Sequence, residues 1–64
     1  MGFGKTLKRE RRLIEMTQVK LAEEVGCDYQ AIAKWEMGKS LPDYKRFLKV
    51  CKILKMDPND FMEE

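Results

Sequence analysis

The sequence predicts an all-helical fold, and three observations support that prediction. Apolar residues recur at spacings of three and four along most of the 64-residue chain, which is typical of helices with one buried face. The alternating pattern of a half-exposed strand is absent. Residues that commonly cap helices precede four of the apolar segments. We therefore expect a compact five-helix arrangement in a single domain that comprises residues 1–64.

The first helix is expected from Gly4 to Ile14. Its apolar residues Phe3, Leu7 and Ile14 share one face, with Arg11 beside them, so this face is expected to meet the core. The other basic residues of the segment are expected in solvent: Lys5, Lys8, Arg9 and Arg12.

Two short helices are expected next, separated by a tight turn. Thr17 is a good N-cap for a helix that ends at about Val25, and Gly26 favours the left-handed conformation that ends a helix. Asp28 is expected to cap a third helix that extends to about Met37. The residues with core-facing spacing in this pair are Leu21, Ala22, Val25, Ile32 and Trp35.

A fourth helix and a short fifth one complete the predicted fold. Asp43 is expected to cap a helix that reaches about Leu54, with Ile53 opposite its core face. Asp57-Pro58 predicts a last short helix, since Pro is tolerated in a first turn. The residues predicted on the core face of the fourth helix are Tyr44, Phe47, Leu48, Cys51 and Leu54.

The net charge of +2 is unevenly distributed along the chain. Residues 1–56 carry all 13 Lys and Arg and only seven acidic residues, whereas residues 57–64 carry four acidic residues and no basic one. A basic body with an acidic end is suited to a phosphate-rich partner that approaches from one side.

The residue inventory argues against catalysis and against a metal centre. There is no histidine, no Gly-rich phosphate loop and no nucleophile with a base beside it, so we expect neither an enzyme nor a cofactor or metal. Cys27 and Cys51 are expected to be reduced and partly buried. Without a signal peptide or a long apolar segment, the sequence predicts a cytoplasmic protein.

The central part of the chain has the pattern of a helix-turn-helix motif, which we place at residues 17–37. Together with its flanks, this segment reads MTQVKLAEEVGCDYQAIAKWEMGKSLP. It resembles the phage repressor and Cro helix-turn-helix family of transcriptional regulators (XRE-like), and the resemblance continues to Phe61. The resemblance implies binding of double-stranded DNA, with the third helix in the major groove.

The resemblance also implies which residues contact DNA. Of the base-contacting residues, Gln30 suits adenine, Lys34 suits guanine and Ala33 suits a thymine methyl group. Tyr29 suits either a base or a phosphate. The implied phosphate contacts are Gln18 at the start of the second helix and three residues of the loop after the third, Lys39, Ser40 and Leu41.

Two further features follow from the resemblance. Arg11 and Glu36 match a pair that forms an internal salt bridge in relatives, which would fix the third helix against the first. Glu15 and Lys55 stand where relatives often carry glycine, the residue that best tolerates a left-handed backbone. If Lys55 adopts that conformation, the strain would cost about 1 kcal/mol.

The apolar residues near the C-terminus are open to two interpretations. Ile53, Met56, Phe61 and Met62 either cover the core or form the contact of a homodimer, which symmetry and the family resemblance favour.

We therefore expect a DNA-binding transcriptional regulator, a repressor that binds a palindromic operator as a homodimer. The alternative is a protein-interaction module on the same scaffold, such as an antitoxin-like protein or a co-regulator. The polar and basic third-helix face favours DNA.

Overall fold

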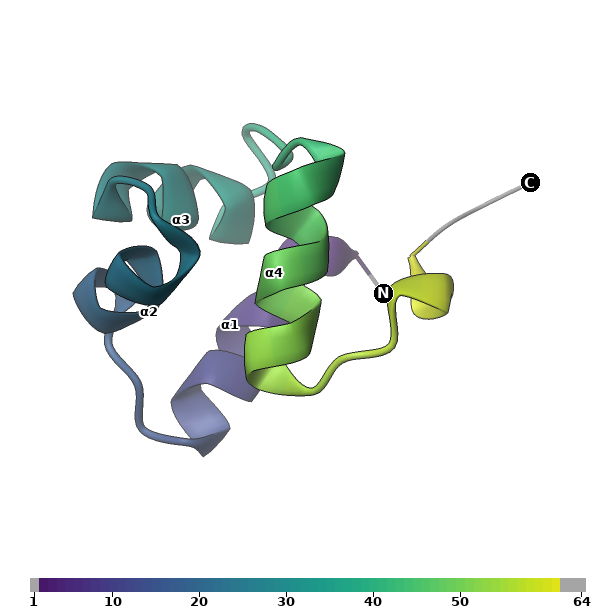
Figure 1. Ribbon diagram of the computed structural model, residues 1–64, viewed down its shortest axis with the longest axis horizontal. Helices are drawn as coiled ribbons and strands as arrows, with labels where there is room; N and C mark the ends of the chain where they lie inside the picture. Colours follow the sequence, from purple (N-terminus) through teal and green to yellow (C-terminus); the bar gives the residue numbers. More distant parts are fainter. Residues whose placement is uncertain (1, 62–64) are drawn as a thin grey trace.

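The computed structural model describes residues 2–61, and within that range the chain is helical with no strand (Figure 1). The elements are α1 (Phe3–Leu13), α2 (Gln18–Val25), α3 (Tyr29–Glu36), α4 (Tyr44–Leu54) and the 3-10 turn η1 (Pro58–Asp60). The all-helical prediction is confirmed. The predicted fifth helix is a 3-10 turn instead, held by i→i+3 hydrogen bonds from the amides of Asp60 and Phe61.

The predicted capping residues are in place at three helix starts. The side chain of Thr17 accepts a hydrogen bond from the Lys20 amide at 3.0 Å, and Asp43 accepts one from the Arg46 amide at 2.8 Å. Asp28 caps α3 in the same way. These side chains satisfy amides that have no partner within a first helical turn, which is why the helices begin where the sequence predicts.

The core lies where the four helices meet. In Figure 1, α2 and α3 form one side of the molecule, α4 crosses in front, and α1 lies behind α4. The buried apolar residues are Leu7, Leu21, Ala22, Val25, Ile32, Trp35, Val50, Cys51 and Leu54.

The predicted core face of α1 is wrong at its last residue. Ile14 is 53% exposed, because α1 ends at Leu13 and the chain leaves the helix before Ile14 can follow the helical period. The buried face includes Leu7 and Arg11, as expected, and also Thr6.

The predicted core face of α4 is rotated relative to the observed one. Tyr44 and Leu48 are 61% and 37% exposed, whereas Val50, which is absent from the predicted face, is fully buried. Ile53, predicted on the opposite face, is half-buried and packs against the core. The observed buried face of α4 is therefore turned by roughly 50° about the helix axis from the predicted one, half of the 100° between successive residues.

Three phenylalanine rings join the two ends of the described chain. Phe3 lies 5.5 Å from Phe47 and 5.4 Å from Phe61, measured between ring centroids, and Phe47 lies 6.2 Å from Phe61. Both contacts of Phe61 are edge-to-face, a favoured geometry for aromatic pairs. This cluster fixes η1 against the start of α1.

Two non-glycine residues adopt a left-handed backbone, and replacing either with glycine is expected to stabilise the domain. Glu15 has φ 56° and Lys55 has φ 57°. A non-glycine residue in this conformation destabilises the folded state by about 1–2 kcal/mol. Glycine avoids that strain, but it loses more backbone entropy on folding, which costs about 0.5–1 kcal/mol. Glu15→Gly and Lys55→Gly should therefore each raise the melting temperature by a few degrees.

The control for these variants is Lys52→Gly, in the last turn of α4. The same change inside a regular helix should destabilise the domain by up to about 1 kcal/mol. Calorimetry of the three variants would contradict the interpretation if Glu15→Gly or Lys55→Gly lowered the melting temperature as Lys52→Gly does.

Candidate nucleic-acid interface

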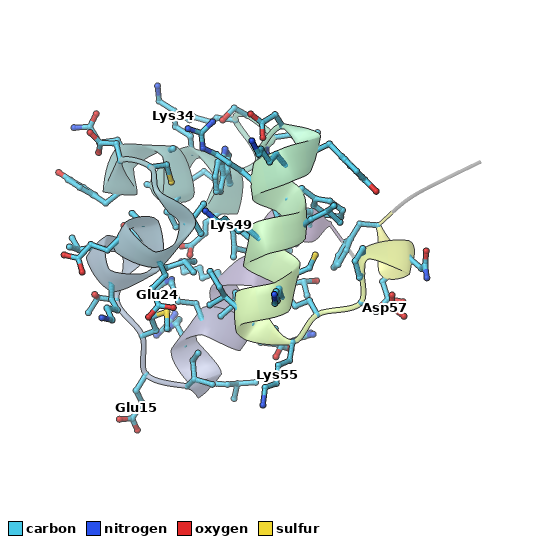
Figure 2. The ribbon with its side chains drawn as sticks, viewed as in Figure 1. Glu15, Glu24, Lys34, Lys49, Lys55 and Asp57 are labelled. Carbon is cyan, nitrogen blue, oxygen red and sulfur yellow. The ribbon has the colours of Figure 1, made fainter. Side chains whose placement is uncertain are left out.

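One face of α3 is exposed and carries all four residues that the sequence assigns to base contacts. Gln30 and Lys34 are exposed, Tyr29 is 48% exposed and Ala33 is half-buried. Figure 2 shows Lys34 pointing away from the body of the domain, at the opposite end of the view from Lys55. Four neighbouring side chains that differ in size and polarity thus share one face of α3.

The opposite face of α3 anchors this surface. Ile32 is fully buried and Trp35 is 4% exposed, and both belong to the core cluster. A helix of eight residues has little stability of its own, so this packing supplies most of what keeps α3 helical. The exposed side chains are therefore presented by a backbone that the core fixes.

The turn between α2 and α3 depends on Gly26, which has φ 89°. Its amide and the amide of Cys27 both donate hydrogen bonds to the Ala22 carbonyl, at 2.8 and 3.0 Å. Lys49 of α4 donates a further, longer hydrogen bond of 3.5 Å to the Val25 carbonyl. Together these contacts end α2 and link the turn to α4.

A buried ion pair joins α1 to the end of α3. Arg11 Nε donates to Glu36 Oε2 at 2.6 Å, and a second guanidinium nitrogen donates to Glu36 Oε1 at 3.2 Å. The Arg11 and Glu36 side chains are only 11% and 3% exposed. The remaining guanidinium nitrogen of Arg11 donates to the Met16 carbonyl at 2.7 Å. The structure thus places together the two residues that the sequence assigns to a salt bridge.

Gln18 belongs to the same network. Its side-chain amide donates to Glu36 Oε1 at 3.0 Å, so the first residue of α2 is held by the last residue of α3. The sequence predicts a phosphate contact for Gln18 and gives no sign of this bond. The Gln18 amide group has a second hydrogen, and the side chain is half-buried.

The loop after α3 carries the other residues assigned to phosphates. Gly38 has φ 77°, and the Lys39 amide donates to the Lys34 carbonyl at 2.9 Å, which ends the helix. The side chains of Lys39, Ser40 and Leu41 are all exposed, Leu41 by 74%. Leu41 also lines an open hollow of about 290 Å³. The other residues lining that hollow are Phe3, Pro42, Tyr44, Phe47 and Phe61.

The residues proposed from sequence as a dimer contact do not form one exposed cluster. Ile53 and Met56 are half-buried and pack against the core, and Phe61 is held in the aromatic cluster. Met62 lies outside the described residues. Phe61 borders two exposed apolar side chains, those of Leu41 and Tyr44.

Gly4 is a structural residue that sequence reasoning misses. A Cβ atom at this position would lie 2.3 Å from the Trp35 carbonyl oxygen and 2.9 Å from that of Glu36. The start of α1 thus lies directly against the backbone at the end of α3. A glycine within a helix can mark such a close approach, but the sequence predicts the first helix to begin at Gly4, so this signal was absent from the prediction.

Other kinds of site have little support in the described part of the chain. Residues 2–61 contain no cluster of three or more potential metal ligands and no helix long and apolar enough to cross a membrane. Cys27 and Cys51 are free thiols. Burial raises the pKa of both thiols, and at Cys27 the nearby Arg46 partly counteracts this effect.

Known proteins with the same pattern are helix-turn-helix regulators. The family described as Helix-turn-helix matches residues 7–61. The chain is 35% identical over 60 residues to the SPbeta prophage-derived uncharacterized HTH-type transcriptional regulator YonR of Bacillus subtilis, covering 94% of this chain and 55% of YonR. It is 29% identical over 56 residues to the cryptic phage CTXphi transcriptional repressor RstR of Vibrio cholerae, covering 88% of this chain and 50% of RstR.

A solved structure shares the fold closely. The P22 c2 repressor in complex with synthetic operator 9T superposes with a TM-score of 0.88 and 25% identity, covering 92% of this chain and 89% of that one. The chain spans about half the length of the curated relatives it matches. On its family match over residues 7–61, the chain belongs to the helix-turn-helix family, and over most of its length it has the fold of the P22 c2 repressor.

Proposed function

We propose that this protein is a sequence-specific transcriptional repressor that binds a palindromic operator as a homodimer, with α3 in the major groove. The observation that carries the proposal is the exposed face of α3, with Gln30 and Lys34 held outward by the buried Ile32 and Trp35. The operator complex of the P22 c2 repressor and the repressor RstR support it.

Direct reading would come from the N-terminal part of α3. The Gln30 amide matches the donor and acceptor of an adenine edge, and the Lys34 ammonium can donate to guanine O6 and N7. Ala33 is small enough to pack on a thymine methyl group, and Tyr29 reaches either a base or a phosphate. Each good contact of this kind discriminates against a wrong base by about 1–3 kcal/mol.

Phosphate contacts would position the domain on both sides of α3. Gln18 has one amide hydrogen on Glu36 and can donate the other to a phosphate, beside the amides at the start of α2. Lys39, Ser40 and Leu41 would approach a second phosphate from the loop after α3, the last two through backbone amides. Such contacts set the register and the salt dependence without reading sequence.

A homodimer would place two α3 helices about 34 Å apart, one turn of DNA. Phe61 is the best placed of the predicted contact residues, because it adjoins the exposed side chains of Leu41 and Tyr44. Ile53 and Met56 are half-buried against the core, so in this contact they would contribute only their exposed parts. Met62 remains part of the proposed contact on sequence grounds alone.

The test is selection from a randomised duplex library at two salt concentrations. Wild-type protein should select a palindrome, Gln30→Ala should relax one position in each half-site, and Gln18→Ala should weaken all sequences alike. Asn59→Ala is a control for the DNA contacts, because it removes an exposed side-chain amide from η1, which contains none of the residues proposed to contact DNA.

Two outcomes would contradict the proposal. If wild-type protein enriches no sequence at either salt concentration, α3 does not read DNA, and a protein-interaction role replaces this one. If Gln30→Ala selects the same site with the same stringency as wild type and Asn59→Ala, the assignment of Gln30 to a base is wrong.

A further inference from the structure

A second basic surface lies on α1 and plays no part in the contacts proposed so far. Lys5, Lys8 and Arg12 are exposed and follow one another at spacings of three and four, so they form one stripe along the helix. They line an open hollow of about 480 Å³. Arg9 and Leu13 complete its lining, which contains no acidic side chain.

The charges of this α1 stripe have no ion-pair partner among residues 2–61. In the range 2–61, no ion pair involves Lys5, Lys8 or Arg12. Exposed basic side chains commonly remain solvated, so charge alone does not identify a binding surface. The position of the stripe relative to α3 is what makes it informative.

The stripe reaches the C-terminal end of α3 at Lys5, and near its other end it adjoins Arg11 in the sequence. Lys5 lines a hollow of about 300 Å³ together with Glu36, Met37 and Gly38 at the end of α3. Arg12 directly follows Arg11, whose guanidinium group binds the carboxylate that also holds Gln18. On a helix, Lys8 and Arg12 lie about 60° and 100° from Arg11 in the same direction, so both lie to one side of the residue that binds Glu36.

We propose that the α1 stripe binds backbone phosphates of DNA that flanks the half-site read by α3. The inference rests on the proposed function, because it requires α3 to be docked on an operator. DNA is the favoured occupant since a phosphate strand that passes Gln18 continues as a regular line of negative charge. The guanidinium and ammonium groups would bind phosphate oxygens and read no sequence.

The experiment compares two duplexes for the same protein. One contains only the selected palindrome, and the other extends it by about 10 base pairs, one helical turn, on each side. Wild-type protein should bind the longer duplex about tenfold more tightly in fluorescence anisotropy, whatever the sequence of the flanks. Lys8→Gln/Arg12→Gln should bind the short duplex like wild type and bind the long duplex no more tightly than the short one.

Salt dependence provides a second readout. The slope of log affinity against log salt concentration has a magnitude of about 0.9 for each phosphate that the protein neutralises, so on the long duplex the slope of the double variant should be smaller by about 2. Lys52→Gln/Lys55→Gln removes the same charge from exposed positions at the end of α4 and should behave like wild type.

The outcomes separate this inference from the proposed function. If wild-type protein binds neither duplex, the proposed function itself fails. If it binds the short duplex but gains nothing from the flanks, the proposed function stands and the α1 stripe does not contact DNA. An equal weakening in the α1 and α4 variants would also overturn the inference, because net charge would then explain it.

Discussion

Replacing Gly4 with alanine is expected to lower the free energy of unfolding by about 2–3 kcal/mol. The new methyl carbon would lie 2.3 and 2.9 Å from the carbonyl oxygens of Trp35 and Glu36, and backbone atoms cannot rotate away. Overpacking usually costs about 1–3 kcal/mol and occasionally more. The better helix propensity of alanine, worth up to about 1 kcal/mol, offsets only part of this cost.

This destabilisation is large for a chain of 64 residues, since such cores rarely supply more than about 3–5 kcal/mol. Urea unfolding followed by circular dichroism would measure it. Gly2→Ser is the control, because a Cβ at Gly2 meets nothing within 4 Å and serine is a favoured N-cap. An unchanged midpoint for Gly4→Ala would mean that α1 and α3 do not approach so closely.

Replacing Arg11 with methionine is expected to destabilise the domain by about 3–5 kcal/mol, enough to unfold much of the protein. The change leaves the Glu36 carboxylate, 3% exposed, with the Gln18 amide as its remaining side-chain partner, and it removes a donor from the Met16 carbonyl. A buried charge without its counter-ion costs more than the pair contributes. The double variant Arg11→Met/Glu36→Leu should therefore be more stable than Arg11→Met alone.

A double-mutant cycle in urea would measure the coupling between the two residues. Arg46→Met provides the matched control, because the Asp43–Arg46 pair has side chains that are 59% and 45% exposed. Its removal should cost less than about 1 kcal/mol. If Arg11→Met cost no more than Arg46→Met, the Arg11–Glu36 pair would not be a determinant of stability.

The parts of the fold that depend on local chemistry were predictable from sequence. Thr17, Asp28 and Asp43 cap helices through bonds to amides two or three residues away, and Gly26 ends α2 through its own backbone preference. None of these interactions requires knowledge of another helix. The starts of α2, α3 and α4 were therefore predicted correctly.

The parts that depend on packing were predicted less well. The buried face of α4 is set by α1, α2 and η1 together, so Val50 is buried while Tyr44 and Leu48 are exposed. A helical wheel drawn from α4 alone places Tyr44 on the core face and leaves Val50 off it. The wheel contains no information about the helices that pack against α4. The exposure of Ile14 has a similar origin, since it depends on where α1 ends.

The candidate site shows the same division. The exposure of Gln30 and Lys34 follows from their spacing relative to Ile32 and Trp35 within one helix. The bond between Gln18 and Glu36 joins residues 18 positions apart, and no local pattern predicts it. Only the packing of α2 against α3 brings these two side chains together.

The bond between Gln18 and Glu36 has a consequence for the choice of operator. The bond ties the start of α2 to the end of α3, so the distance between Gln18 and the loop at Lys39 is fixed by the fold. On the proposed function, the DNA must bend or change its groove width until two phosphates match the distance between these two contacts. Bending a duplex site costs about 1–6 kcal/mol, depending on its sequence. Base pairs that no side chain touches would then contribute to selection through their stiffness.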